Sequence, residues 1–218
     1  MGSSVESILQ RAGAYHRGHF VLTAGGHSPY YINAAAMLAD PIALGAVAWE
    51  MAERLAAMPT PPQFIVCPAE AAIPLCTLIT AAHNEMAPAP ILGLYASKVE
   101  GAKGEFEFKR GQGDLVRGRQ GIVLDDLGTS GRSVKKVVDL TRENGGDVVA
   151  VHYLVIRGQD VTLESVGGVP ELWAPLVLGL PEYKAEECPL CADGVPINTD
   201  LGHGAAYVAE HGQPVKRA

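Results

Sequence analysis

Cysteine is scarce in this chain, which has four cysteines among its 218 residues. The disulfide framework of a small secreted domain needs more cysteines at a more regular spacing. Cys67 and Cys76 lie within apolar runs, so they are predicted to be core residues. The sequence therefore excludes a disulfide-stabilised scaffold.

The other two cysteines form a C-x-x-C pair, Cys188 and Cys191. Such a pair could be half of a zinc site with His203 and His211, but these spacings fall outside finger-like patterns and no second C-x-x-C exists. The three histidines within 16–27 (His16, His19 and His27) are interpreted as surface or hydrogen-bonding residues. We therefore expect no metal ligands among these residues.

Long apolar runs are also missing. No stretch approaches the roughly 18 uninterrupted apolar residues that a membrane-spanning helix needs. Residues 1–13 lack a basic start followed by an apolar segment, so they do not resemble a targeting sequence. We expect a cytoplasmic protein with no membrane partner.

Basic residues do not predominate, since 17 lysines and arginines stand against 24 acidic residues, a net charge of −7. Nucleic-acid binding depends on neutralising phosphates, so we expect no nucleic-acid partner. The Walker A pattern G-x-x-x-x-G-K-[S/T] is absent as well. Any anion site must therefore be local. The hydrophobic content of 48% suffices for the core of one domain.

The order of the apolar segments favours alternating strands and helices. Buried strands are predicted at 63–67, 91–95, 121–124 and 148–156, with helices at 41–58, from 73 to about 83, and at 133–144. Repeated β-loop-α units favour an α/β fold, with a central mostly parallel sheet flanked by helices. Such sheets bind ligands at the carboxyl ends of their strands.

Residues 123–134, V-L-D-D-L-G-T-S-G-R-S-V, carry the most specific pattern. A strand ends in two carboxylates, Asp125 and Asp126, and a small-residue loop then leads into a helix. The backbone N–H groups of 129–132 would point into one concavity and bind an anion. The alternative is an ordinary strand-to-helix turn capped by Ser133.

The acid pair beside an anion site needs a partner of its own. Two carboxylates would repel a phosphate unless they face a divalent cation or the vicinal hydroxyls of a sugar. A ribose 5-phosphate satisfies both halves, with its hydroxyls against Asp125 and Asp126 and its phosphate in the loop 128–133. The pattern thus predicts a sugar-phosphate site.

This segment resembles the 5-phosphoribosyl-1-pyrophosphate (PRPP) signature of the type I phosphoribosyltransferases. Residues 13–33, G-A-Y-H-R-G-H-F-V-L-T-A-G-G-H-S-P-Y-Y-I-N, are similar to the opening of the orotate phosphoribosyltransferases, and Arg157-Gly158 matches the family's strand-ending Arg-Gly. The segment 187–196, E-C-P-L-C-A-D-G-V-P, is similar to the tail of one bacterial subgroup. The resemblance implies transfer of ribose 5-phosphate from PRPP to orotate, with release of pyrophosphate.

The resemblance also implies roles for individual residues. The catalytic candidates are Asp125, Asp126 and Lys98. The PRPP-binding candidates are Gly128, Thr129, Ser130, Gly131, Arg132, Ser133, Ala69, Glu70, Ala71, Lys103 and Arg110. The base-binding candidates are Arg157, Thr23, Tyr31, Ile32 and Thr129.

A Mg²⁺ cofactor and a homodimer are implied in the same way. The resemblance also implies a type I phosphoribosyltransferase fold with a small N- and C-terminal hood. We expect one phosphoribosyltransferase domain over 1–198, with the N-terminal hood at 1–40, followed by a loosely ordered tail at 199–218. The glycine-rich and basic segment 96–118 is interpreted as a mobile flap, or alternatively as a solvated hairpin.

Some positions depart from the family pattern and leave two alternatives open. Thr23 and Ala24 stand where these enzymes usually have a basic residue and serine, which motivates a phosphoribosyltransferase for another nucleobase. Glu70 puts a negative charge where pyrophosphate is expected, which motivates a PRPP-binding regulatory protein without turnover.

Overall fold

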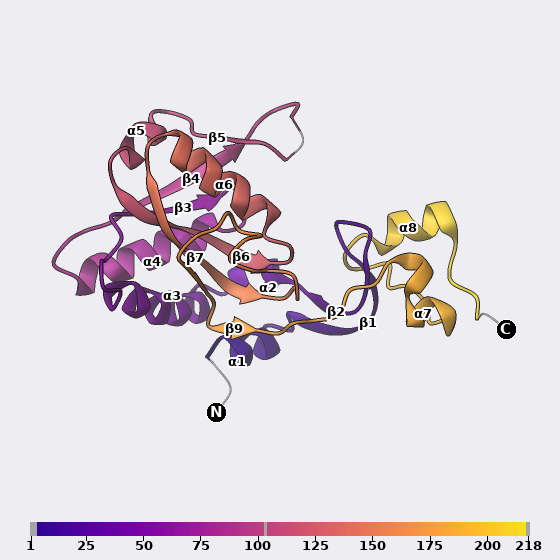
Figure 1. Ribbon diagram of the computed structural model, residues 1–218. Coiled ribbons are helices and arrows are strands. Elements are labelled where there is room, and N and C mark those ends of the chain that lie inside the picture. Colours follow the sequence, from indigo (N-terminus) through magenta and orange to yellow (C-terminus); the bar gives the residue numbers. More distant parts are fainter. Residues whose placement is uncertain (1–3, 103, 217–218) are drawn as a thin grey trace.

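The computed structural model describes residues 4–102 and 104–216 (Figure 1). In chain order its elements are α1 (Ser4–Arg11), β1 (Tyr15–Val21), β2 (His27–Ile32), α2 (Ala34–Leu38), α3 (Pro41–Ala56), β3 (Phe64–Pro68), α4 (Ile73–Met86), β4 (Leu92–Lys98), β5 (Phe106–Glu107), α5 (Gln112–Val116), β6 (Gln120–Gly128), α6 (Arg132–Glu143), β7 (Asp147–Ile156), β8 (Glu171–Trp173), β9 (Leu176–Val177), the 3₁₀ turn η1 (Ala185–Glu187), α7 (Pro189–Ala192) and α8 (Gly204–His211).

A central sheet forms the body of the molecule. Its described strands run in the order β5-β4-β3-β6-β7-β8, with β9 also paired to β7. The pairings β3–β4, β3–β6, β6–β7, β7–β8 and β7–β9 are parallel, and only β4–β5 among the sheet's described pairings is antiparallel. The predicted α/β fold with a mostly parallel sheet is confirmed.

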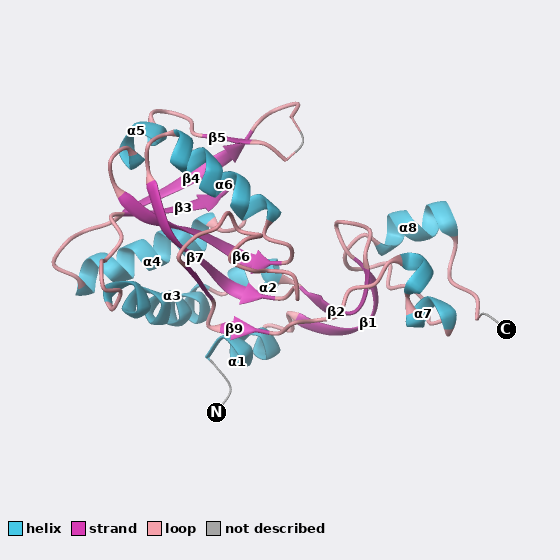
Figure 2. Ribbon diagram, in the orientation of Figure 1, coloured by secondary structure: helices cyan, strands magenta, loops and turns pink. Residues whose placement is uncertain are grey.

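Helices cover both faces of this sheet (Figure 2). Apolar residues of α1, α3 and α4 form one core cluster with one face of the strands, and α6 forms a second cluster with the other face. The buried residues of α6 are Val134, Val137, Val138 and Thr141, a spacing that places them on one side of a helix. Every residue of β3 is buried, as expected for a strand covered on both faces.

The strand β6 is longer than its sequence predicts. The expected strand ended at position 124, but pairing with β7 continues through Leu127 and Gly128, opposite Val155 and Ile156. The acidic pair therefore belongs to the strand itself instead of following it. The predicted end of the strand at position 124 was wrong, because pairing with the neighbouring strand extends the ladder past the two polar residues.

A second, smaller unit lies beside the sheet, and we call it the hood. It consists of the β1–β2 hairpin and residues 181–216, which include α7 and α8 (Figure 1). Backbone hydrogen bonds join the two pieces, because His27 and Tyr183 exchange N–H···O bonds of 2.8 Å and the N–H of His203 donates to the oxygen of Val21. Segments from the two ends of the chain thus form one unit.

The segment 96–118 contains an antiparallel β4–β5 pairing, in which Ser97 lies opposite Glu107 and Lys98 opposite Phe106. Lys136 of α6 contacts this hairpin through the oxygen of Gly104 at 2.8 Å and the carboxylate of Glu105 at 2.7 Å.

Within the described residues, none of the helices combines the length and the apolar character needed to cross a bilayer.

Candidate active site

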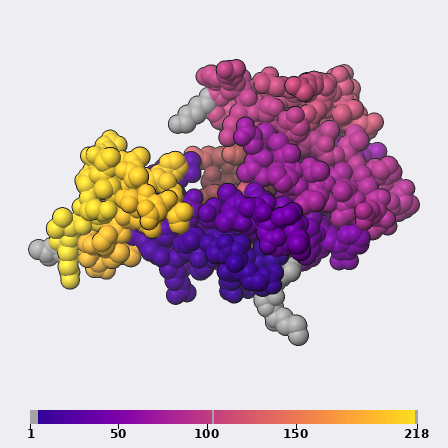
Figure 3. All heavy atoms as spheres, turned by 180° about the vertical axis from the view of Figure 1, so that it is seen from behind, coloured from indigo at the N-terminus to yellow at the C-terminus, as the bar shows by residue number. Residues whose placement is uncertain are grey.

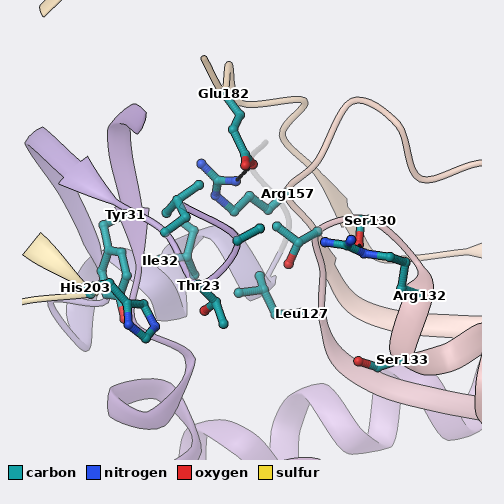
Figure 4. A pocket seen from close by; sticks show the side chains of 14 residues that line it. Thr23, Tyr31, Ile32, Leu127, Ser130, Arg132, Ser133, Arg157, Glu182 and His203 are labelled. Carbon is teal, nitrogen blue, oxygen red and sulfur yellow. Dashed lines mark hydrogen bonds and ion pairs between the residues drawn. The ribbon is translucent and has the colours of Figure 1, made fainter. Parts of the chain in front are cut away.

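A cavity of about 510 Å³ lies between the hood and the carboxyl end of the sheet (Figure 4). The space-filling view shows the yellow C-terminal part of the hood set apart from the upper part of the body by a notch (Figure 3). The cavity is lined by Leu22, Thr23, Ala24, Tyr31, Ile32, Leu127, Thr129, Ser130, Arg132, Ser133, Arg157, Glu182, Gly202 and His203.

One wall of the cavity is the start of α6. The residue before this helix, Gly131, has a left-handed φ of 75° and no side chain caps the helix end. The first N–H groups of an α-helix have no partner within the helix, so an uncapped start attracts an anion. Ser133 is the second residue of the helix and does not cap it, so the capping role that the alternative gave to Ser133 was wrong.

Strand β7 fixes the loop that precedes α6. The backbone N–H groups of Arg157 and Gly158 both donate to the oxygen of Gly128, at 2.8 and 3.0 Å. A Cβ atom at position 158 would collide with the carbonyl oxygen of Thr129. The close approach of loop and strand therefore requires glycine at position 158.

The two carboxylates precede this loop at the end of β6, next to Leu127 of the cavity wall. Asp125 accepts a 3.0 Å hydrogen bond from the backbone N–H of Asp126. Burial, together with the charge of Asp126, raises the pKa of Asp125 well above its usual value. Neither carboxylate forms an ion pair with a basic side chain in the described part of the chain.

Arg157 lies on the hood side of the cavity and is only 2% exposed. Its Nη2 donates to the hydroxyl of Ser28 at 2.8 Å, and its Nη1 lies 3.4 Å from the Oε2 of Glu182 (Figure 4). Burial lowers the pKa of this guanidinium, and Glu182 partly offsets that effect. The cavity thus has a cation at its hood side, already facing one carboxylate.

The structure brings together many of the predicted site residues. The cavity lining includes Thr23, Tyr31, Ile32, Thr129, Ser130, Arg132, Ser133 and Arg157. Sequence reasoning missed Leu22, Leu127, Glu182, Gly202 and His203 as lining residues. Glu182 and His203 come from irregular segments without a motif, so no local sequence signal identifies them.

Other predicted residues lie outside the cavity lining. Ala69, Glu70 and Ala71 follow β3, and Lys98 is the exposed last residue of β4. β3 pairs with β6 and β4 pairs with β3, and both pairings are parallel. The carboxyl ends of β3 and β4 therefore share the edge that carries the acidic pair. Arg110 is exposed, whereas Lys103 lies outside the described residues.

Comparisons with known proteins identify the family. A curated orotate phosphoribosyltransferase from Thermus thermophilus is 30% identical over 201 residues, which are 88% of this chain and 97% of the relative. Another from Carboxydothermus hydrogenoformans is 35% identical over 185 residues, or 83% and 87% of the two chains. The chain belongs to the orotate phosphoribosyltransferase family.

The structural comparison agrees with this family assignment. The crystal structure of orotate phosphoribosyltransferase from Aeropyrum pernix superposes with a TM-score of 0.64 at 25% identity, covering 80% of this chain and 93% of that one. A comparison with models of protein families gave no match. The resemblance to the orotate phosphoribosyltransferases is thus confirmed, while the subgroup indicated by C-P-L-C stays a prediction.

Proposed function

We propose that this chain transfers the 5-phosphoribosyl group of PRPP to orotate, giving orotidine 5′-monophosphate and pyrophosphate. The bond between ribose C1 and the pyrophosphate oxygen breaks, and its electron pair leaves with pyrophosphate. N1 of orotate forms the new bond to C1 and gives up its proton. One observation carries the proposal: the uncapped start of α6 and Arg157 line the same cavity, and the Asp125-Asp126 pair comes shortly before that helix start in the chain.

The 5′-phosphate occupies the loop 128–133. The backbone donors at the start of α6 and the hydroxyls of Thr129, Ser130 and Ser133 suit a phosphate. The carboxylates of Asp125 and Asp126 hold the ribose hydroxyls. Because positive charge develops on the ribose as pyrophosphate leaves, these carboxylates also stabilise the transition state.

The pyrophosphate leaves toward the edge formed by the loop 69–71 and the segment 96–118. Lys98, with Lys103 or Arg110, takes up the developing negative charge once this segment closes as a flap. Such closure would need the contacts of Lys136 with Gly104 and Glu105 to adjust, because they tie the hairpin to α6.

Magnesium is the expected cofactor. The oxygen donors of Asp125 and Asp126 fit it, since Mg²⁺ is usually bound by one or two carboxylates together with substrate phosphates. Within the described residues these carboxylates have no basic partner that would compete with the ion. When bound, Mg²⁺ neutralises charge on the departing pyrophosphate.

The base lies on the hood side of the cavity. Arg157 is the proposed partner of the orotate carboxylate, because a guanidinium can donate two parallel hydrogen bonds to it. Tyr31 and Ile32 flank the pyrimidine ring (Figure 4). Thr23, between β1 and β2, and Thr129, which follows β6, line the same cavity.

A second acceptor is favoured by one observation. Glu182 already faces Arg157, and its charge disfavours a carboxylated base. A phosphoribosyltransferase for a non-carboxylated nucleobase is therefore the second candidate. A competition assay with orotate, uracil and purines decides between the two: nucleotide formed from orotate alone supports the first, and nucleotide formed only from another base supports the second.

We also propose a homodimer. On α3, Ile42 is 86% exposed and Trp49 is 44% exposed, and residues seven apart lie on the same side of a helix. Light scattering coupled to size exclusion tests the assembly. A mass of one chain would contradict the proposed dimer, whereas twice that mass would support it.

A further inference from the structure

Two histidines and two cysteines meet inside the hood. His19 and His27 come from the β1–β2 hairpin, and Cys188 and Cys191 flank the start of α7 at the other end of the chain. One ligand atom from each residue lies within 4.8 Å of the other three. All four residues are buried, with exposures of 1%, 0%, 1% and 8%.

The separations match a tetrahedral metal site. The Nε2 of His19 lies 3.6 Å from the Sγ of Cys188 and 3.7 Å from that of Cys191, and the Nδ1 of His27 lies 3.3 Å from the Sγ of Cys191. Zinc bonds of about 2.3 Å to sulfur and 2.0–2.1 Å to nitrogen give sulfur–nitrogen edges of about 3.5 Å in a tetrahedron. The two nitrogens, at 2.9 Å, would separate by about 0.4 Å to reach a tetrahedral edge of about 3.3 Å.

The surroundings of His19 are those of a metal ligand. Its second ring nitrogen, Nδ1, lies 2.8 Å from the oxygen of Val195 and can donate to it. With the proton on Nδ1, the lone pair on Nε2 faces the cluster and is free to bind a metal. Ligating histidines usually donate their other ring N–H in this way. The backbone N–H of Asn198 also donates to the backbone oxygen of His19 at 2.7 Å, so both the ring and the backbone of His19 are bonded to the C-terminal segment.

The hood has only a small apolar core of its own. Its buried apolar residues Phe20, Val21, Leu22 and Ile197 belong to neither of the two core clusters of the body. Its C-terminal helices are short, four residues in α7 and eight in α8. A unit this small commonly needs a metal or a disulfide for stability.

We propose that His19, His27, Cys188 and Cys191 bind one Zn²⁺ ion, which ties the N-terminal hairpin to the C-terminal segment. Two nitrogens and two thiolates in a tetrahedral arrangement are a ligand set typical of a single zinc ion. Four protein ligands leave no open position, so the ion is structural and does not take part in the transfer reaction. This site differs from the one weighed on sequence spacing, because His203 lines the cavity and His211 stacks on Tyr207.

The zinc site bears on the cavity through the two pieces that it joins. The hairpin supplies Thr23 and Tyr31 to the lining, and the C-terminal segment supplies Gly202 and His203. Loss of the ion would weaken the attachment of these two pieces and leave the backbone hydrogen bonds, such as those between His27 and Tyr183, to join them. The phosphate loop belongs to the body and would stay in place.

The test is the metal content of the purified full chain, measured by plasma mass spectrometry after passage over a chelating resin. The proposal predicts one zinc per chain in the wild type and only trace zinc in Cys188→Ser/Cys191→Ser and in His27→Gln. Two matched controls retain the zinc: Cys67→Ala, which removes a buried thiol outside the cluster, and Asp126→Asn, which removes a carboxylate of the proposed PRPP site.

Wild-type protein alone decides the question if the variants do not fold. Exchange of the zinc for Co²⁺ should give the visible absorption bands of tetrahedral cobalt and a thiolate-to-cobalt charge-transfer band. Trace zinc in the wild type, or a disulfide between Cys188 and Cys191 in protein purified without oxygen, would overturn the proposal. Full zinc in the double cysteine variant would overturn it as well.

Discussion

Arg157 and Glu182 face each other at the hood side of the cavity, with Nη1 3.4 Å from Oε2. The distance is long for an ion pair with good geometry, and the side chain of Glu182 is 36% exposed whereas that of Arg157 is 2% exposed. The carboxylate of Glu182 can therefore move away from Arg157. The guanidinium stays in place, because its Nη2 donates to the hydroxyl of Ser28 at 2.8 Å. An incoming carboxylate would take the place of Glu182.

Glu182→Gln should improve the use of orotate. Removing the negative charge ends both the competition for Arg157 and the repulsion of the substrate carboxylate, so KM for orotate should fall up to about 5-fold, the size of a partly exposed charge interaction. Steady-state kinetics at saturating PRPP measures this. Glu187→Gln, at an exposed position of the same segment, is the matched control and should leave KM unchanged. An increase in KM would mean that Glu182 contacts the base favourably.

Asp125→Asn should stabilise the free protein at neutral pH. Because the folded-state pKa of Asp125 is raised, its ionisation costs stability as the pH rises. The melting temperature of the variant should exceed that of the wild type near pH 7, and the difference should vanish at pH values below about 3.9, where the carboxyl group is protonated in both states. Asp139→Asn, which removes an exposed carboxylate of α6, should show no such pH-dependent difference. A variant less stable than the wild type at pH 7 would refute this effect.

Gly158→Ala should disrupt the phosphate loop. The added Cβ collides with the carbonyl oxygen of Thr129, so either the loop or the end of β7 must shift. Overpacking of this kind costs about 1–3 kcal/mol, and PRPP affinity measured by calorimetry should fall with it. Gly45→Ala in α3 is the control, because a Cβ atom there meets no neighbour within 4 Å. Unchanged PRPP affinity in Gly158→Ala would show that the loop does not hold the phosphate.

His152 should make the fold sensitive to acid. Burial lowers its pKa from 6.5 to about 4, although Glu171, 3.2 Å away, acts in the opposite direction. A histidine with a lowered pKa stabilises the fold above pH 6.5, and this contribution is lost as the pH falls from 6.5 toward 4. Chemical denaturation across this range should show wild-type stability falling more steeply than that of His152→Leu. Equal slopes would contradict the buried, neutral state of the ring.

The sequence predicted the elements whose order is local. The acidic pair, the loop 128–133 and the start of α6 are contiguous, so one motif describes the strand, the loop and the helix. Arg157 was predicted from the strand-ending Arg-Gly of the family motif. In the structure this end of β7 lies beside the loop 128–133. Even there the end of β6 was misjudged, since pairing with β7 decides where the strand ends.

The resemblance implied a hood built from both ends of the chain, but the contacts within it could not be predicted in the same way. Glu182 meets Arg157 across 25 positions, and Cys188 meets His19 across 169. These contacts depend on how the C-terminal segment packs on the β1–β2 hairpin, including the His27–Tyr183 bridge, and no spacing rule for contiguous motifs describes them. Tertiary packing therefore determines both the hood wall of the cavity and the histidine–cysteine cluster.

The most direct measurement is the consumption of orotate, followed by ultraviolet absorbance, with PRPP and Mg²⁺ present. We predict a loss of absorbance that requires PRPP and that slows about 100-fold or more in Asp126→Asn, because this carboxylate supports the ribose in the transition state. Asp139→Asn should react at the wild-type rate. No PRPP-dependent loss of orotate in protein that binds PRPP by calorimetry would contradict the proposed reaction, and full turnover in Asp126→Asn would contradict the placement of the ribose.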